Sequence, residues 1–369
     1  MSEVDEQYML TALRLARKGY GRTSPNPMVG AVLVKGRTII GKGWHRIAGG
    51  AHAEIAAIQE ARQNDHNIKG STLYVNLEPC CSTGRTPPCT QAIIDSGIVR
   101  VVVGAVDPNP SHSGRAFRVL KKSGIEIRKG VLSNESNGLN AAFNHWITSH
   151  TPYVILKSAM TLDGKIATVS GESKWITGEK ARGEGLHMRK GSDAIIVGVK
   201  TVLVDDPSLL ARGKRGGVTL RRVILDSKAR TPLSAKVVSD ENSAQTTVVA
   251  LRSASSRRIV ALRRKVNVIQ APERKGRIDL KWLMKRLGKE GVANLLVEGG
   301  GEVNGAFLDN NLAHKIAFFY APKIVGGTDS CVALAGVGAP DLGRTRILHN
   351  AEWRRMGPDL LLTACLVGD

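Results

Sequence analysis

The stretch EPCCSTGRTPPC (residues 78–89), with His-Ala-Glu at residues 52–54, decides the interpretation of this sequence. His52, Cys80 and Cys89 offer one imidazole and two thiolates, a donor set that suits Zn²⁺. Three protein ligands leave a fourth position for water, which is the pattern of catalytic zinc sites. Glu54 lies beside this set and can carry protons as a general base and then a general acid. The sequence therefore predicts a catalytic zinc centre, with His52 and Cys89 at helix starts.

A closed structural zinc site is the alternative. It needs a fourth ligand, which Cys81 or His45 could supply. It would leave the carboxylate of Glu54 and both prolines before the cysteines without a purpose. We therefore favour the open, catalytic arrangement.

Strands and helices alternate on both sides of these motifs, which is typical of a layered α/β domain with a mostly parallel sheet. We expect strands at 29–36, 71–78, 99–106 and 125–130, and helices at 5–18, 52–62, 87–97, 114–124 and 135–150. Pro152 disfavours continuation of the last helix. We place a domain boundary there, giving domains 1–150 and 151–369. The second domain repeats the alternation, with strands at 153–160, 193–199, 221–227, 246–251, 266–270, 294–300 and 315–321 and helices near 178–190 and 304–310.

Composition and charge narrow the function classes. Apolar residues make up 42% of the 369 residues, which indicates a folded protein, and the acidic start and the lack of a long apolar run disfavour secretion and membrane insertion. The formal charge is +21, and residues 251–290 alone carry 13 basic and 3 acidic side chains. Their spacing is typical of surface helices with basic outer faces, which we favour over a polyanion site because aromatic residues are scarce there.

Several ordered motifs resemble one family, the bifunctional riboflavin-biosynthesis deaminase/reductases. Nucleobase deaminases share the H-x-E and P-C layout, but eight residues separate the two cysteine ligands here, as in the EPC…GRTPPC segment of this family. The other matching motifs, spread over essentially the whole chain, are SPNPMVGAVLV (24–34), GWH…HAE (43–54), DPNP (107–110), LKSAMTLDGKIA (156–167), SGESKWITG (170–178), DAIIVGVKTVLVDDPSLLAR (193–212), VILDS (223–227) and VEGGGEVNGAFL (297–308).

The resemblance implies two successive reactions on one pyrimidine ribotide. The first is zinc-dependent hydrolytic deamination of 2,5-diamino-6-(ribosylamino)pyrimidin-4-one 5'-phosphate by a cytidine-deaminase-like α/β/α domain. The second is NADPH-dependent reduction of the ribosyl group to ribityl by a dihydrofolate-reductase-like α/β domain. The resemblance also implies a cytoplasmic enzyme that is a homodimer or tetramer, and it involves neither nucleic acid nor membrane.

The resemblance assigns roles residue by residue. It makes His52, Cys80 and Cys89 the zinc ligands, Glu54 the proton carrier and Cys81 a bystander. Against the substrate it places Asn26, His45, Ser173, Arg189, Leu209, Arg212 and Glu298, with Lys157 and Asp205 as further aids to ribose placement. Against NADPH it places Ala159, Trp175, Thr201, Asp205, Ser227, Gly300, Gly301, Glu302, Val303, Asn304, Gly305 and Ala306.

The glycine run before residue 304 is open to two interpretations on its own. No G-x-G-x-x-G follows the first strand of the second domain, so a Rossmann fold is weakly supported. The later run Gly299 to Gly301 fits either a plain turn or a site where backbone N–H groups approach a diphosphate. The resemblance favours the diphosphate.

The chain departs from the family pattern at two positions. Ser82 stands where many members have His, and Ala51 stands where Pro often precedes the His-Ala-Glu motif. We expect the first change to remove a substrate contact and the second to alter only a loop.

Two other functions are compatible with the residues alone. One is a nucleoside or nucleic-acid deaminase with a basic accessory domain, whose polyanion affinity would fall steeply with salt. The other is a non-catalytic, metal-stabilised binding protein, which has no use for Glu54.

Overall fold

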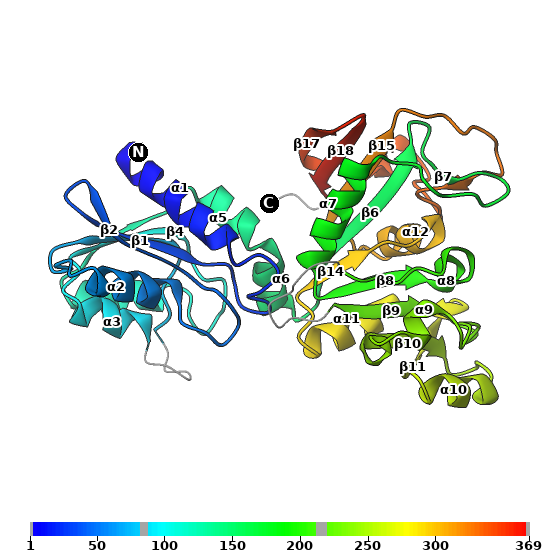
Figure 1. The fold of residues 1–369 in the computed structure, drawn as a ribbon, viewed down its shortest axis with the longest axis horizontal. Coiled ribbons are helices and arrows are strands. Elements are labelled where there is room, and N and C mark those ends of the chain that lie inside the picture. The colour runs from blue at the N-terminus through cyan, green and yellow to red at the C-terminus, as the bar shows by residue number, and fades with distance from the viewer. Residues whose placement is uncertain (1–2, 82–87, 212–219, 367–369) are drawn as a thin grey trace. The chain divides into compact units, whose positions relative to one another are not determined.

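The protein folds into two compact units. A computed structural model describes residues 3–81, 88–211 and 220–366, and the units are divided between His150 and Thr151 (Figure 1). None of the described helices has the length and apolar composition needed to cross a bilayer. Each unit is built around one central sheet, as the α/β interpretation predicts.

The first unit is a five-stranded sheet with helices on both faces. The strand order is β2-β1-β3-β4-β5. The elements are α1 (Glu3–Arg17), β1 (Gly30–Lys35), β2 (Thr38–Trp44), α2 (Ala53–Gln63), β3 (Thr72–Leu77), α3 (Cys89–Asp95), β4 (Arg100–Ala105), α4 (Arg115–Lys122), β5 (Glu126–Lys129), α5 (Ser133–Leu139) and α6 (Ala141–Ser149).

Alternate residues of each strand build the two cores of this unit, because successive side chains of a strand point to opposite faces. Leu33 faces α2, α3 and α4, and the neighbouring Val32 faces α1. This arrangement is the three-layer α/β/α sandwich expected for a cytidine-deaminase-like domain.

The first sheet is mixed, which corrects the expectation of a mostly parallel one. Strand β1 pairs antiparallel with both β2 and β3, whereas β3–β4 and β4–β5 are parallel. The cause is β2, which the sequence did not indicate. It returns directly from β1 through a turn at Gly36, whose φ is +61°, and a hairpin of this kind makes neighbouring strands antiparallel.

The helix expected over residues 135–150 is two helices. They meet at Asn140, whose backbone φ of −108° leaves the helical range. The side chain of Asn140 is buried and bonds the loop before β1: its Oδ1 accepts from Met28 N at 2.8 Å and its Nδ2 donates to Met28 O at 3.0 Å. The break in the helix therefore fixes that loop.

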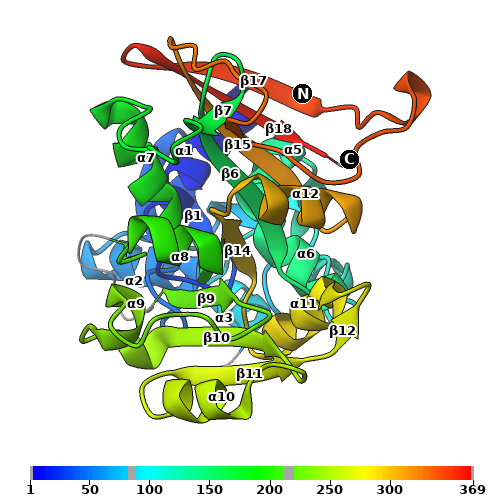
Figure 2. The same ribbon diagram turned by 90° about the vertical axis from the view of Figure 1, so that its right-hand side faces the viewer.

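The second unit is a nine-stranded sheet in the order β11-β10-β9-β8-β14-β6-β15-β18-β17 (Figure 2). The first seven strands of this order run parallel, and β18 and β17 close the sheet as an antiparallel hairpin. The strands are β6 (Tyr153–Thr161), β8 (Ala194–Gly198), β9 (Arg221–Leu225), β10 (Thr246–Leu251), β11 (Asn267–Ala271), β14 (Asn294–Val297), β15 (Lys315–Ala321), β17 (His349–Met356) and β18 (Asp359–Cys365).

Helices cover both faces of this sheet. Helices α11 (Leu280–Lys289) and α12 (Gly301–Asp309) pack on one face. The other face carries α7 (Glu179–Lys190), α8 (Val199–Asp205), α9 (Lys236–Ser239) and α10 (Ser256–Arg263). Short strands β7 (Lys165–Ala167) and β16 (Cys331–Val332) pair with each other, as do β12 (Glu273–Arg274) and β13 (Arg277–Ile278).

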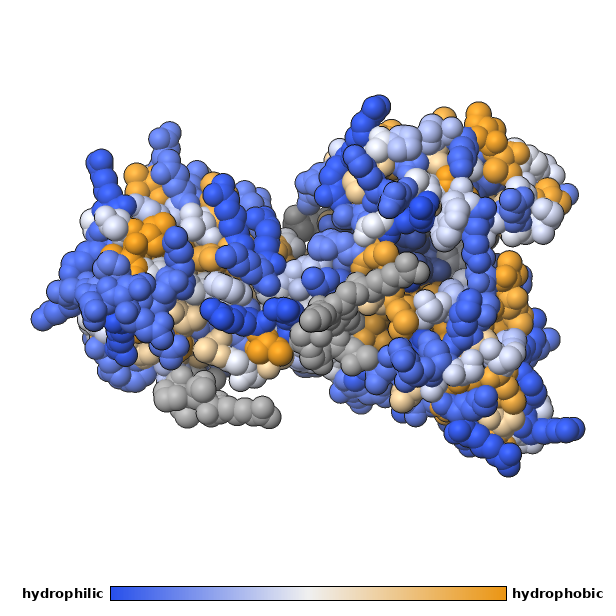
Figure 3. All heavy atoms as spheres, in the orientation of Figure 1, coloured by the Kyte–Doolittle hydropathy of each residue, from blue (hydrophilic) through white to orange (hydrophobic). Residues whose placement is uncertain are grey.

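The basic stretch 251–290 contributes surface helices, as expected. Helix α10 buries Ile259 and Leu262, and α11 buries apolar side chains one and two turns apart while its lysines and arginines stay outside. Hydrophilic residues predominate at this end of the unit in the space-filling view (Figure 3).

Candidate active sites

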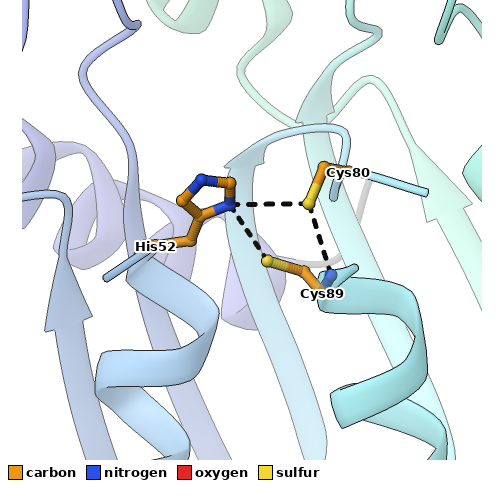
Figure 4. A group of neighbouring side chains, drawn as sticks. All are labelled: His52, Cys80 and Cys89. Atoms are coloured by element: carbon orange, nitrogen blue, oxygen red, sulfur yellow. Dashed lines mark hydrogen bonds between the residues drawn. The ribbon is translucent and has the colours of Figure 1, made fainter. Parts of the chain in front are cut away.

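Three side chains converge in the first unit as one donor set (Figure 4). His52 Nδ1 lies 3.2 Å from Cys89 Sγ and 3.5 Å from Cys80 Sγ, and the three donor atoms all lie within 4.8 Å of one another. Zinc bonds of about 2.0 Å to nitrogen and 2.3 Å to sulfur at a tetrahedral angle require an N···S separation of roughly 3.5 Å. The donor set therefore fits a zinc ion.

The positions of the three donors follow from the ends of secondary elements. His52 is the N-cap of α2, Cys89 is the first residue of α3 after the N-cap Pro88, and Cys80 follows β3. The backbone N–H of Cys89 donates to Cys80 Sγ at 3.3 Å. Helix N-termini carry partial positive charge and favour thiolate. Pro88 holds the chain extended immediately before Cys89, with a φ of −63° and a ψ of 144°.

Ionisation differs among the three donors, because hydrogen bonds with Cys80 raise the pKa of the Cys89 thiol and that of the His52 ring. The hydrogen bond with Cys89, helped by His52, lowers the pKa of the Cys80 thiol to about 4, so Cys80 is a thiolate at neutral pH. Glu54 is the second residue of α2 and is only 3% exposed, and this burial raises its pKa. A carboxyl group that takes up protons this readily is suited to proton transfer.

No fourth ligand completes the set within the described residues. The group of possible metal donors contains only His52, Cys80 and Cys89. The ring of His45 stands edge-on to that of His52, and both of its nitrogens are engaged elsewhere: Nδ1 with Ala51 O at 3.0 Å and Nε2 with Asn26 Nδ2 at 3.2 Å. The site is therefore the open type rather than the closed structural type.

These two contacts also fix the state of His45. Nδ1 must donate to the Ala51 carbonyl, so Nε2 accepts from the Asn26 amide. Burial lowers the pKa of His45, which keeps its ring neutral. Ala51 acts here through its carbonyl oxygen, which a proline would also supply. Ser82, the other departure from the family pattern, lies outside the described residues.

The donor set opens into a pocket of about 290 Å³. Asn26, His45 and Glu54, all expected from the sequence, line it together with His52 and Cys80 of the donor set. Its apolar wall is formed by Phe143, Trp146 and Ile147 of α6, and its polar wall by Glu78, Asp107, Asn109 and His112. The sequence did not indicate the apolar wall, although its three residues recur at the i, i+3 and i+4 spacing of one helix face.

Glu78 holds the polar wall in place rather than facing a ligand. Its carboxylate accepts hydrogen bonds from the backbone N–H groups of Asp107, Gly114 and Ala116, at 3.2, 2.9 and 3.1 Å. Because Glu78 stands two residues before Cys80, the loop over residues 107–116 and the cysteine ligand are positioned by one side chain.

In the second unit, the residues expected at NADPH gather at the carboxyl ends of parallel strands. Ala159 lies near the end of β6, Ser227 two residues after β9, and Gly300 three residues after β14. Thr201 and Asp205 lie on α8, which follows β8 directly. Open parallel sheets bind ligands at this edge.

The glycines immediately before and within α12 have different surroundings. A Cβ on Gly300 would meet nothing closer than Ile166 Cδ1 at 3.8 Å, and Gly300 caps the helix without a side-chain hydrogen bond. The free N–H groups of the first turn thus suit an anionic group. Gly301 and Gly305 instead face the backbone of Val332 and Ala335, and a Cβ there would collide at 2.3 and 1.6 Å.

Other members of the expected cofactor set have partners in the protein. Asn304 is fully buried and donates to Ala333 O at 3.0 Å, and Glu302 pairs with Lys200 at 2.7 Å on the surface. Val303 packs against Gly299, and Ala306 lies at the edge of the core. Trp175 is 66% exposed, and Arg182 stacks over its ring at 4.6 Å.

Two charged side chains among the expected substrate residues, Arg189 and Glu298, are in contact. Arg189 and Glu298 form a two-point pair at 2.8 Å in both contacts, and Lys157 Nζ lies 3.7 Å from the same carboxylate. Burial opposes ionisation of Glu298, but the charges of Lys157 and Arg189 prevail and lower its pKa to about 2. Nearby, Ser173 Oγ donates to Asp205 Oδ1 at 2.9 Å.

Two expected substrate residues stand apart. The side chain of Leu209 belongs to the hydrophobic core and is 2% exposed, so it can meet a ligand only through its backbone, which has a φ of +52°. Arg212 lies outside the described residues.

Comparison with known proteins identifies both halves of the chain. The family model of the RibD C-terminal domain matches residues 152–362, and that of the cytidine and deoxycytidylate deaminase zinc-binding region matches residues 2–105. The chain is 40% identical over 359 residues to the riboflavin biosynthesis protein RibD of Actinobacillus pleuropneumoniae, covering 97% of this chain and 94% of that one. It is 42% identical over 365 residues to RibD of Aquifex aeolicus, covering 98% of each.

Solved structures give the same result. RibD of Acinetobacter baumannii is similar with a TM-score of 0.85 and 33% identity, over 98% of this chain and 99% of that one. A diaminohydroxyphosphoribosylaminopyrimidine deaminase/5-amino-6-(5-phosphoribosylamino)uracil reductase of Thermotoga maritima is similar with a TM-score of 0.84 and 37% identity, again over 98% and 99%. The zinc-type donor set, the reductase fold and these full-length matches together place the chain in the RibD family, the bifunctional deaminase/reductases of riboflavin biosynthesis.

Proposed function

We propose that residues 1–150 deaminate 2,5-diamino-6-(ribosylamino)pyrimidin-4-one 5'-phosphate and that residues 151–369 reduce the ribosyl group of the product with NADPH. The observation that carries the proposal is the three-donor set His52, Cys80 and Cys89 with Glu54 buried beside it in one pocket. Family membership favours this function over a nucleoside or nucleic-acid deaminase and over a non-catalytic protein. A homodimer or tetramer is part of the proposal.

In the first reaction, water replaces the 2-amino group and ammonia leaves. Zinc, when held by His52, Cys80 and Cys89, supplies a Lewis acid that acidifies water toward neutral pH. Glu54 takes one proton of the attacking water and passes it to the ring nitrogen, and then takes the second proton from the added hydroxyl and passes it to the departing amine. Asn26 and neutral His45 hold the pyrimidine, and Phe143 and Trp146 of α6 line the apolar side of the pocket.

In the second reaction, the ribosyl group is reduced to ribityl. NADPH supplies the hydride. Its diphosphate would be held by the uncapped first turn of α12 after Gly300, and its remainder by Ala159, Thr201, Asp205 and Ser227 along the same sheet edge and by Trp175 from the segment before α7. Arg189 would position the ribose phosphate and Lys157 the ribose, while Glu298 holds both cations in place, so the chain contributes mainly orientation of the reactants.

A coupled assay on the purified full-length protein tests this function. The diaminopyrimidine ribotide is supplied, and ammonia release and NADPH oxidation are followed with and without a zinc chelator. We expect chelator-sensitive ammonia release followed by NADPH oxidation. Ammonia release without NADPH oxidation would overturn the reductase assignment, and absence of both from folded, zinc-loaded protein would overturn the proposal as a whole.

A further inference from the structure

Four exposed basic side chains lie where β9 and β10 end, beside the start of α10 (Figure 2). None of them makes an ion pair or a hydrogen bond with a residue that the structure describes. We call this group the basic corner. It consists of Lys228 and Arg230 after β9, Arg252 directly after β10, and Arg257 in the first turn of α10.

The basic corner has no acidic side chains on its own segments. Neither residues 227–239 nor residues 242–272 contain an Asp or a Glu. Single exposed bases are ordinary on a protein surface, but several of them without a carboxylate nearby in the chain leave a positive potential open to solvent. Such a potential attracts an anionic ligand.

The loop of the basic corner, residues 227–231, is held from both sides. Asp226 is fully buried, and its Oδ2 accepts hydrogen bonds from the N–H and the hydroxyl of Thr231 at 2.6 and 2.7 Å. From α10, Arg258 donates to Ala229 O at 3.0 Å and to Thr231 O at 2.8 Å. The loop backbone is thus fixed before a ligand arrives, which lowers the entropic cost of binding.

The basic corner adjoins a residue that the resemblance places at NADPH. Ser227 is half-buried, and its hydroxyl makes no hydrogen bond with a described residue. Leu251 N donates to Ser227 O at 3.1 Å, which continues the parallel register of β9 and β10 beyond their last paired residues. Lys228 and Arg252 therefore leave the sheet at neighbouring points, roughly one strand spacing of 4.8 Å apart.

The distance along the sheet edge matches the reach of one nucleotide. Strand β14, which leads into the glycine turn before α12, is separated from β9 by β8 alone. Two strand spacings put the end of β9 about 10 Å from the end of β14. A diphosphate at α12 and a second phosphate at the basic corner would thus be separated by roughly the width of one ribose. NADPH carries its diphosphate and its 2'-phosphate on the same ribose, whereas NADH has a hydroxyl in place of the 2'-phosphate.

We propose that Lys228 and Arg252 bind the 2'-phosphate of the adenosine ribose, assisted by the hydroxyl of Ser227, and thereby select NADPH over NADH. This phosphate carries about −1.5 to −2 charges at pH 7, and the hydroxyl of NADH is neutral. The inference rests on the proposed function and adds the residues that recognise its cofactor. A nucleic acid fits the basic corner less well, because residues 220–281 contain no aromatic side chain on which bases could stack.

Binding titrations on the full-length protein test this assignment. Lys228→Met and Arg252→Met each remove one charge and keep an unbranched side chain. Each should raise the Kd for NADPH roughly tenfold, as expected for the loss of one charged hydrogen bond, and leave the Kd for NADH within about twofold. Nicotinamide fluorescence reports both values. Lys281→Met is the matched control, because Lys281 is exposed on α11 at the opposite face of the sheet and should affect neither Kd.

Two fragments of the cofactor isolate the contribution of the 2'-phosphate. Adenosine 2',5'-bisphosphate should displace NADPH from the parent chain at a lower concentration than adenosine 5'-phosphate does, and Lys228→Met or Arg252→Met should remove this advantage. The advantage should also shrink as pH falls below about 6, where the 2'-phosphate takes up a proton. A bisphosphate that displaces NADPH no better than the monophosphate would overturn the proposal.

The outcomes separate cofactor selection from the reaction. Both side chains are exposed, so the variants should keep the parental Tm. Equal weakening of NADPH and NADH, or no change for either, would overturn the role of Lys228 and Arg252. A parent chain that binds and oxidises NADPH and NADH equally well would also overturn it, while the proposed reductase would stand. A parent chain that binds neither nucleotide would overturn both.

Discussion

Three buried carboxylates show how neighbouring residues set the state of one chemical group. Among the described residues, the ring of His52 is the one cationic group that acts on Glu54, and burial raises the pKa of Glu54. Burial acts on Glu298 in the same direction, but Lys157 and Arg189 outweigh it. The hydrogen bond from Arg100 lowers the pKa of Asp5, which also accepts from Tyr74 and Arg128. Glu54 alone is thus suited to exchange protons, and the other two act as permanent anions.

Replacing Glu54 with Gln should abolish proton transfer while keeping shape and volume. We expect ammonia release to fall by about 10²–10⁴-fold, with zinc content by elemental analysis unchanged because Glu54 is not in the donor set. NADPH-dependent reduction of the deaminated pyrimidine should be unaffected. A Glu54→Gln variant with parental ammonia release would disprove the proton-carrier role.

Asp5→Asn should weaken the attachment of α1 to the sheet, because it removes the charge that Arg100 and Arg128 share. We expect a loss of about 2 kcal/mol in unfolding free energy at pH 7, measured by urea denaturation. The folded pKa of Asp5 is lowered, so its contribution is complete above the unfolded pKa of about 3.9 and is lost as pH falls through the folded value. The difference between variant and parent should therefore narrow below about pH 4; a pH-independent difference would refute the ionic origin.

At the scale of elements, α12 separates two uses of glycine. Gly301 and Gly305 lie one turn apart and let the chain at 332–335 pass against the helix, whereas Gly300 leaves its backbone open at the N-terminus. Within the seven-residue run expected at the cofactor, Gly301 and Gly305 therefore serve packing, and Gly300 has a backbone open enough for a ligand to approach.

The pair Gly305→Ala and Gly300→Ala tests this division. Gly305→Ala should destabilise the protein by about 1–3 kcal/mol, because its Cβ would overlap Ala335 O. Gly300→Ala should change stability by less than about 0.5 kcal/mol and weaken NADPH binding, measured by fluorescence titration. Equal stability losses in the two variants would contradict the assignment.

The sequence predicted the elements that carry regular apolar patterns. Strands β1, β3 and β4 and helices α2 and α3 are confirmed, because their periodicity reports burial directly. Strand β2 was not predicted because Gly41 and Gly43 interrupt its pattern. A Cβ at either would lie 2.3 or 2.1 Å from a carbonyl of α2, so these glycines serve close helix packing rather than a loop. The polar strand β17 has no buried face and gives no pattern to detect.

The zinc-type site could be predicted because chemistry restricts its ligands to few residue types, and it is assembled as expected. The pocket walls could not. Phe143 and Trp146 come from a helix about 90 residues after the His-Ala-Glu motif, and only the tertiary fold brings them there. Leu209 is the opposite case. The resemblance places it among the substrate residues, whereas the fold buries its side chain in the hydrophobic core.

For the whole molecule, the two sites are built from separate sets of residues in separate units. Chelation of zinc should therefore lower ammonia release at least about 100-fold and leave NADPH oxidation with the deaminated pyrimidine unchanged. The control is chelator already saturated with zinc, and a parallel loss of both activities would show that the sites depend on one metal.

The strand order of the second unit has a consequence during synthesis. Its first strand, β6, lies between β14 and β15, which come more than 130 residues later in the chain. Buried residues of β6 such as Val154 and Leu156 have no neighbouring strand until residue 297 has been made, and lack the second neighbour until residue 321 has been made. The first unit has all its strands by residue 129 and can fold while the rest is translated. The nascent chain thus passes through a long interval in which the first unit can be native while the second, still lacking strands, is exposed to aggregation.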